Sequence, residues 1–204
     1  MVKKLFFFIT LLFAGISHAQ ISQNLQQASQ LLRQITGAEV RPYSTRDFGR
    51  EKYDGAISVL IDEQKAESIL AKIRNELPSG LVAFIGTTRS LAKPPAKGVE
   101  LVVGHGQGPL DILEIAKTDA VNYDMVTNDL KARLAQWHNT YGIDIWQAET
   151  DTIQLRFKQM PSNLKAFAKE VYKFCPDIVD QGVGTESALI QAIKEQKGLY
   201  LWWD

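Results

Sequence analysis

The spacing of apolar residues along the 204-residue chain predicts alternating helices and strands. Apolar positions that recur every three or four residues indicate amphipathic helices, and strict alternation or short apolar runs indicate strands. Helices are expected over residues 22–37, 66–77, 110–117, 127–141, 162–174 and 186–197. Strands are expected over 56–61, 81–85, 99–103, 143–148, 152–157 and 199–203, with a further short one over 38–43.

The order of these elements predicts a mixed α/β (α+β) fold. Strand 56–61, the following helix and strand 81–85 have the lengths of a βαβ unit, whose strands run parallel with a right-handed crossover. Segments 143–148 and 152–157 are expected to form a hairpin. We therefore expect a single mixed sheet of about six strands with a βαβ unit, covered by helices. Because no long polar linker interrupts the chain, we expect one globular domain, with helix 22–37 as a possible arm on it.

The chain closes with LYLWWD, residues 199–204, which places two of its four tryptophans beside the last residue. Large side chains alternate onto both faces of this segment, which is typical of a strand covered on both sides. We therefore expect the C-terminal strand to be buried. Asp204, with two carboxylates at the end of that strand, is a candidate site residue.

The first nineteen residues have the pattern of a secretory signal peptide. A basic start at Lys3 and Lys4 precedes the apolar run 5–16, and 17–19 (SHA) is a small-x-small cleavage pattern. The run is too short to span a membrane comfortably, and an uncleaved anchor is the alternative. We expect a mature protein that begins near Gln20, is exported to the periplasm or secreted, and has no membrane span after cleavage.

Charge and cysteine content exclude several classes of function. The chain has 23 basic and 23 acidic residues, and removing the leader with Lys3 and Lys4 leaves 21 against 23. Without a basic excess, neither nucleic acid nor anionic lipid is an expected partner. A single cysteine, Cys175, rules out an internal disulfide, and the histidines left after cleavage, His105 and His138, are far apart in sequence. We expect no Cys/His zinc site, no metal and no cofactor.

The glycine-rich loop GHGQGP, residues 104–109, lies where a strand passes into a helix. Glycines there let the backbone approach an anion at the helix N-terminus, although the spacing matches neither the dinucleotide fingerprint nor the P-loop. The alternative is a tight turn that needs glycine for its backbone angles. His105 is the loop's one candidate base, without an identifiable partner.

The stretch 174–185, FCPDIVDQGVGT, is the most distinctive of the chain. Cys175 precedes a proline at the C-terminal end of a helix, where the helix dipole raises the pKa of a thiol, which favours a packing cysteine over a nucleophile. Asp177 and Asp180 could ligate a hard cation, but the repeated acidic positions of a calcium loop are missing. The alternative is that these carboxylates cap turns.

A third polar group, Asn122-Tyr123-Asp124, joins two predicted helices and is expected at least to cap them. It could also meet the acidic residues of 174–185 and the C-terminus in space. The candidate binding residues are Asn122, Tyr123, Asp124, Asp177, Asp180, Gln181, Gly184, Thr185, Trp202, Asp204 and His105.

The region from about residue 80 to residue 204 resembles a bacterial family described only as a domain of unknown function, number four-two-five-three in that series. The residues that carry the resemblance are 122–124 (NYD), 134–142 (LAQWHNTYG), 151–152 (DT), 174–177 (FCPD), 181–185 (QGVGT) and 202–204 (WWD). The resemblance implies a shared fold but no reaction. Residues 20–79 would then supply the N-terminal helix and the first βα part of the same globular domain.

Three hypotheses of function follow. The first is a non-catalytic exported module that binds a protein or small molecule, for instance with an immunity-like or inhibitor-like role. The second is a hydrolase-type enzyme that uses clustered Asp residues, with or without a divalent metal. The third is a structural envelope protein. The enzyme requires Asp124, Asp177, Asp180 and His105 to converge with free side chains, and binding near the C-terminus requires an open surface beside Trp202 and Trp203.

Overall fold

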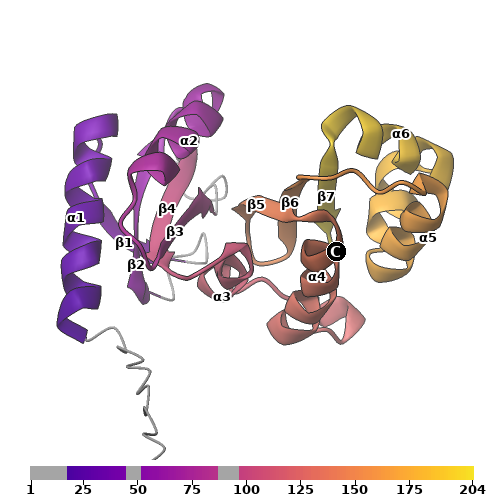
Figure 1. Ribbon diagram of the computed structural model, residues 1–204, viewed down its shortest axis with the longest axis horizontal. Coiled ribbons are helices and arrows are strands. Elements are labelled where there is room, and N and C mark those ends of the chain that lie inside the picture. Colours follow the sequence, from indigo (N-terminus) through magenta and orange to yellow (C-terminus); the bar gives the residue numbers. More distant parts are fainter. Residues whose placement is uncertain (1–17, 45–51, 87–96) are drawn as a thin grey trace, which may run out of the picture.

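The structure is a computed structural model that describes residues 18–44, 52–86 and 97–204 (Figure 1). It confirms a mixed fold of helices and strands built on one sheet. The predicted signal peptide lies outside the described residues up to position 17, and the first helix begins at the next residue, His18. Among the described residues, no helix is both long and apolar enough to cross a membrane.

Seven strands form the sheet, in the spatial order β1-β2-β4-β3-β5-β6-β7. They are β1 (Arg41–Ser44), β2 (Lys52–Ile61), β3 (Leu81–Ile85), β4 (Val99–His105), β5 (Ile143–Ala148), β6 (Thr152–Phe157) and β7 (Gly198–Trp202). The short strand predicted near residue 40 is therefore a full member of the sheet. The hairpin of β5 and β6 has the predicted bounds.

The helices are α1 (His18–Thr36), α2 (Ala66–Glu76), α3 (Ile112–Ala116), α4 (Thr127–Tyr141), α5 (Leu164–Phe174) and α6 (Glu186–Gln196). Four shorter helical turns join them: η1 (Glu63–Lys65), η2 (Pro109–Asp111), η3 (Val121–Tyr123) and η4 (Ile178–Val183). All six predicted helices are present. The segment around Asp180, expected as a turn, is the wide helical turn η4.

The βαβ unit contains an additional strand. β2 and β3 both pair antiparallel with β4, so they run parallel to each other as predicted, but β4 lies between them. The pairs β1–β2, β5–β6 and β6–β7 are also antiparallel. Among the described strands, β3 and β5 are the one parallel pair of neighbours, and they are in register only at Ile85 and Gln147.

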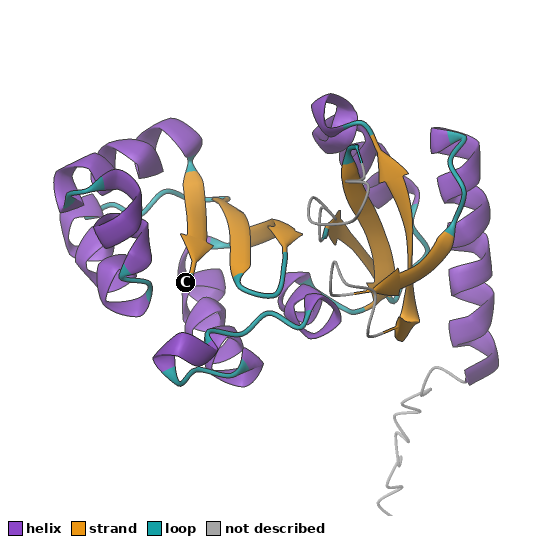
Figure 2. Ribbon diagram, turned by 180° about the vertical axis from the view of Figure 1, so that it is seen from behind, coloured by secondary structure: helices purple, strands orange, loops and turns teal. Residues whose placement is uncertain are grey.

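Two apolar clusters cover the sheet because successive side chains of a strand point to opposite faces. In β4, Leu101 and Val103 join a cluster with α1 and α2, whereas Val102 joins a second cluster with α3 and the C-terminal helices. Figures 1 and 2 show α1 and α2 beside β1–β4, and α4–α6 beside β5–β7. Helix α3 contacts β2, β3, β4 and β5 and so connects the two parts.

Candidate functional site

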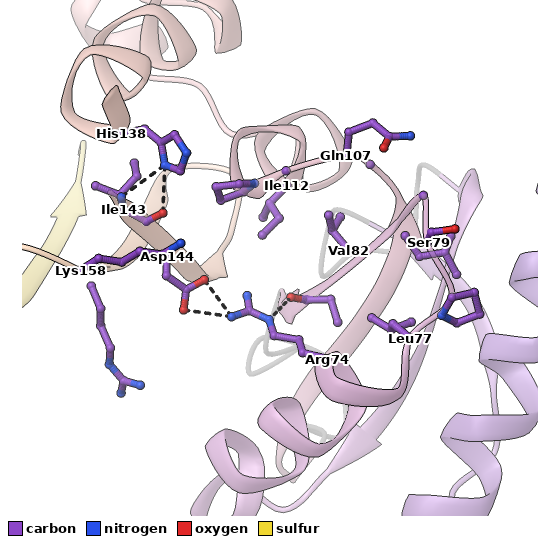
Figure 3. Close-up of a pocket in the computed structure, with 18 of the residues that line it drawn as sticks. Arg74, Leu77, Ser79, Val82, Gln107, Ile112, His138, Ile143, Asp144 and Lys158 are labelled. Carbon is purple, nitrogen blue, oxygen red and sulfur yellow. Dashed lines mark hydrogen bonds and ion pairs between the residues drawn. The ribbon is translucent and has the colours of Figure 1, made fainter. Parts of the chain in front are cut away.

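A cleft of about 700 Å³ opens in the middle of the sheet, where β3 and β5 separate. The strands pair at Ile85 and Gln147 near their C-terminal ends, and no further β3–β5 pair forms in the described chain. The cleft is lined by the end of α2, the start of β3, the loop 106–109, and residues of α4, β5 and β6 (Figure 3).

Arg74 of α2 closes the inner end of the cleft. Its Nε donates to the carbonyl oxygen of Ala83 in β3 at 2.8 Å, and its Nη2 donates to that of Ile145 in β5 at 2.6 Å. Its Nη1 donates to both carboxylate oxygens of Asp144, at 2.9 and 3.0 Å. The guanidinium therefore takes the place of the backbone hydrogen bonds that the separated strands do not make with each other.

His138 of α4 contacts the edge of β5 at Ile143, two residues before the carbonyl group of Ile145 that Arg74 binds. Its Nδ1 lies 3.1 Å from the carbonyl oxygen of Ile143 and 3.3 Å from the backbone nitrogen of the same residue. One ring nitrogen either carries a proton and donates or lacks it and accepts. It therefore satisfies only one of these two backbone groups of Ile143 at a time.

The wall of the cleft is positively charged. Three cationic side chains line it, from Arg74, Arg156 and Lys158, and the carboxylate among its described residues is Asp144, so the formal charge is about +2 (three minus one). Arg156 also pairs with Glu67 outside the cleft at 2.7 Å, which offsets part of that charge. Lys158 is exposed and makes no ion pair with a described residue.

The two sides of the cleft differ in polarity because the strands alternate. The side chains of Val82 and Ile143 lie on the face that packs against Ile112 of α3. Asp144 and its cross-strand neighbour Arg156 lie on the opposite face. Figure 3 shows His138 and Ile112 on one side of the cavity and Arg74 with Asp144 on the other. A ligand in the cleft therefore meets an apolar side and a charged side.

The glycine-rich loop borders the cleft, but its N–H groups already donate hydrogen bonds within the protein. The amides of Gln107 and Gly108 donate to Oδ2 of Asp111, at 2.7 and 3.2 Å, and the amide of Gly106 donates to Gly80. The anion held by this loop is thus the side chain of Asp111. Burial lowers the pKa of His105, and a hydrogen bond with the backbone of Gly80 opposes that shift.

The structure brings four of the predicted site residues together around Asp177. The carboxylate, 3 % exposed, accepts hydrogen bonds from Tyr123 Oη at 2.7 Å, Gln181 Nε2 at 3.0 Å and the backbone N–H of Asp204 at 2.9 Å. Burial favours a raised pKa for Asp177, but the three donors outweigh it and lower the pKa. The bond to Asp177 is also the main cause that raises the pKa of Tyr123 to about 12.

The other predicted residues are spread around this network. Asp180 accepts from Tyr172 Oη at 2.8 Å, and Thr185 caps α6 by accepting from the amide of Ala188. Gly184 ends η4 with a φ of 81°, and Asn122 and Asp124 are exposed in the turn before α4. No group of three or more His, Cys, Asp or Glu side chains in the described part of the chain could hold a metal ion.

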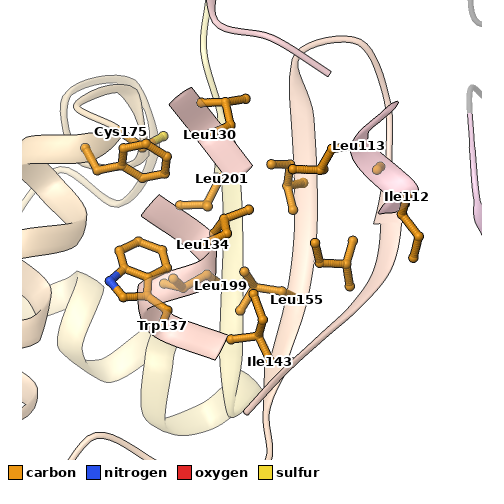
Figure 4. Close-up of a cluster of buried hydrophobic side chains, with 14 of the residues drawn as sticks. Ile112, Leu113, Leu130, Leu134, Trp137, Ile143, Leu155, Cys175, Leu199 and Leu201 are labelled. Atoms are coloured by element: carbon orange, nitrogen blue, oxygen red, sulfur yellow. The ribbon is translucent and has the colours of Figure 1, made fainter. Parts of the chain in front are cut away.

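Cys175 directly follows α5 and is fully buried in the core (Figure 4). Its Sγ donates to the carbonyl oxygen of Trp202 at 3.0 Å. Burial is the main cause that raises the pKa of the thiol to about 11. Since the thiolate is the reactive form, this geometry suits packing and not nucleophilic chemistry.

The surface beside the C-terminus is partly open. Trp203 is 2 % exposed, but Trp202 is half-buried and Tyr200 is 43 % exposed. The rings of Tyr200 and Trp202 stack with centroids 6.4 Å apart, beside an apolar hollow of about 90 Å³ between α6 and β7. The expected burial of β7 thus holds for Leu199 and Leu201 but not for its other face.

Apart from the glycine-rich loop, the residues that line the cleft were not identified from the sequence. Alternation in 143–148 and 152–157 does place Asp144 and Arg156 on an outward face, which is the one signal the sequence carries for them. Arg74, His138 and Lys158 had no such signal, because their common position depends on the separation of β3 from β5.

Among known proteins, neither a curated protein nor a solved structure matches this chain. A family model described as "Domain of unknown function (DUF4253)" matches residues 101–204, half of the chain, and agrees with the resemblance seen in the sequence motifs. The matched region begins in β4 and supplies the β5 and β6 side of the cleft, whereas Arg74 and β3 lie before it. The chain belongs to the DUF4253 family.

Proposed function

We propose that the protein is a non-catalytic binding module that holds an anionic ligand in the cleft between β3 and β5. The observation that carries the proposal is an open cleft of about 700 Å³ with an apolar side and a cationic side. Clefts of about 300–1,000 Å³ are the usual size of ligand sites. The positive wall on a chain of nearly balanced charge favours a ligand with negative charge.

The hydrogen bonds of the acidic residue Asp177 favour binding over hydrolysis as the function of the protein. A general acid or base has to reach the reacting group with a free oxygen. Both oxygens of Asp177 already accept hydrogen bonds, from Tyr123, Gln181 and Asp204. This carboxylate thus holds the C-terminus in place, and the charged groups of the cleft lie on other elements.

A thermal-shift screen of residues 20–204 tests the proposed function. Glutarate, inorganic phosphate and short acidic peptides are added in turn, because a ligand that binds only the native state raises the melting temperature. We expect at least one to stabilise the protein and Lys158→Gln to weaken the effect. Lys165→Gln, an exposed lysine on α5, is the matched control. The proposal fails if no anion stabilises the protein, or if both variants respond alike.

We also propose that the protein is exported, which rests on the pattern of residues 1–19. Expression of the full chain in a Gram-negative host should give a periplasmic protein whose N-terminus, determined by mass spectrometry, is Gln20. A periplasmic fraction without the protein, or a purified chain that retains residues 1–19, would contradict export with cleavage.

A further inference from the structure

We infer that the ligand of the cleft is a short extended peptide with alternating apolar and acidic side chains, which adds to β3 as an extra strand. This inference rests on the proposed function and specifies its ligand. Strand addition to an open sheet edge takes affinity from main-chain hydrogen bonds and specificity from alternate side chains.

The edge of β3 that faces the cleft is available for pairing. The carbonyl oxygen of Ala83 accepts from Arg74 on the side away from β4. The N–H and C=O groups of one residue in a strand point the same way, and alternate residues share a direction. The N–H of Ala83 and both backbone groups of Leu81 therefore face the cleft, where no described strand pairs with them.

The opposite wall has an unsatisfied group of its own. Nδ1 of His138 is within hydrogen-bond distance of both the N–H and the C=O of Ile143 but can serve only one of them. The other backbone group of Ile143 is left available for a ligand, because β3 does not pair with β5 at this position. Because backbone groups that lack partners are unfavourable once water is excluded, a ligand that supplies the missing partner is favoured.

The polarity of the two sides defines the side chains of the peptide. In an inserted strand, successive side chains point alternately toward Val82 and Ile112 on one side and toward Arg156 and Lys158 on the other. Apolar residues suit the first side and carboxylates suit the second. The peptide that fits both sides alternates the two types.

The cleft also limits the length of the peptide. Arg74 closes the inner end at Ala83, and β3 begins at Leu81. Three residues of strand extend over about 10 Å. A peptide of about five residues therefore has three that pair along this edge and two more that extend to the open end of the cleft.

The test measures binding of the peptide acetyl-Val-Glu-Val-Glu-Val-amide to residues 20–204 by isothermal titration calorimetry. Two analogues are N-methylated, one at the valines and one at the glutamates, so that in either register one of them loses the donors that face β3. We expect that analogue to bind at least about tenfold more weakly, the loss of about 1.4 kcal/mol that one main-chain hydrogen bond can supply. The charge-reversed peptide acetyl-Val-Lys-Val-Lys-Val-amide should not bind, and amide exchange at Leu81 and Ala83 should slow when the parent peptide is bound.

The outcomes separate this inference from the proposed function. If glutarate binds in a Lys158-dependent way and the peptide binds no better, or if both N-methylated analogues bind as tightly as the parent, the added strand is wrong and the anion site stands. If neither glutarate nor the acidic peptide binds in a Lys158-dependent way, the proposed function itself fails. The changes in the peptide leave the protein intact, so a folding defect cannot imitate either result.

Discussion

Asp177 shows how a residue that looks catalytic in sequence can be structural. The sequence identified it by its place in FCPD and by its spacing from Asp180. It could not identify the partners, because Tyr123 and Asp204 are far from Asp177 along the chain. In the structure these residues bring η3, η4 and the end of β7 together at one buried carboxylate. The residues of the cluster were thus candidates from the sequence, but the contacts between them were not predictable from it.

Replacing Asp177 with Asn should destabilise the protein. The amide keeps one acceptor oxygen but presents an NH₂ group to a former donor, at a cost of roughly 1–3 kcal/mol in the free energy of unfolding. Because the pKa of Asp177 is lowered in the folded state, its contribution is complete above about pH 4 and is lost as the pH falls through the folded-state pKa. Urea unfolding at several pH values should show the difference from wild type shrinking below about pH 4.

The matched control for this variant is Asp180→Asn. Asp180 is exposed and accepts one hydrogen bond from Tyr172, so its replacement should change the free energy of unfolding by less than about 0.5 kcal/mol. Equal losses for the two variants, or a loss for Asp177→Asn that persists unchanged at pH 3, would contradict the role given to Asp177.

Local periodicity predicted the helices and strands well, but it did not predict the spatial order of the strands in the sheet. The hairpin 143–157 was predicted with its correct bounds because alternation and the intervening turn are local signals. The insertion of β4 between β2 and β3 is a long-range pairing, and nothing in the period of either strand encodes it. The cleft depends on the same long-range order, because it exists only where β3 stops pairing with β5.

Arg74→Lys should weaken the joint between β3 and β5. The one nitrogen of a lysine cannot reproduce the four hydrogen bonds that three guanidinium nitrogens make to Ala83, Ile145 and Asp144, so the loss should be about 1–3 kcal/mol. Urea unfolding measures this loss. Lys72→Met, an exposed position of the same helix, should change the free energy of unfolding by at most about 0.5 kcal/mol. Similar values for both variants would show that Arg74 does not join the strands.

The two tryptophans at the C-terminus should differ sharply in their effect on stability. Trp203 donates from Nε1 to the carbonyl oxygen of Phe174 at 3.2 Å. Its ring also packs edge-on against the Phe174 ring, with the ring centroids 5.4 Å apart. Trp203→Ala should therefore cost roughly 3–5 kcal/mol in the free energy of unfolding. Trp202→Ala, at a half-buried position, should cost about 1 kcal/mol. Urea denaturation measures both, and equal losses would contradict the structure of the terminus.

For the whole molecule, the question is whether the parts on either side of the cleft are one cooperative unit. The sequence predicted one domain from the lack of a linker, which says nothing about the core. In the structure, Tyr43, Phe84 and Val102 from the N-terminal strands belong to the same apolar cluster as α3 and the C-terminal helices. This shared cluster couples the two parts, although β3 and β5 themselves hardly pair.

The tryptophans make this coupling measurable. All four lie in the C-terminal part, at positions 137, 146, 202 and 203, so their fluorescence reports mainly on that part, and only Trp146 also packs against the N-terminal cluster. Far-UV circular dichroism also reports on α1 and α2 of the N-terminal part. Because the shared cluster loses its packing when either part unfolds, we expect both signals to follow one urea transition with the same midpoint. If circular dichroism decreases at lower urea while most of the fluorescence change occurs in a later transition, α1 and α2 unfold independently and the N-terminal wall of the cleft is a separate domain.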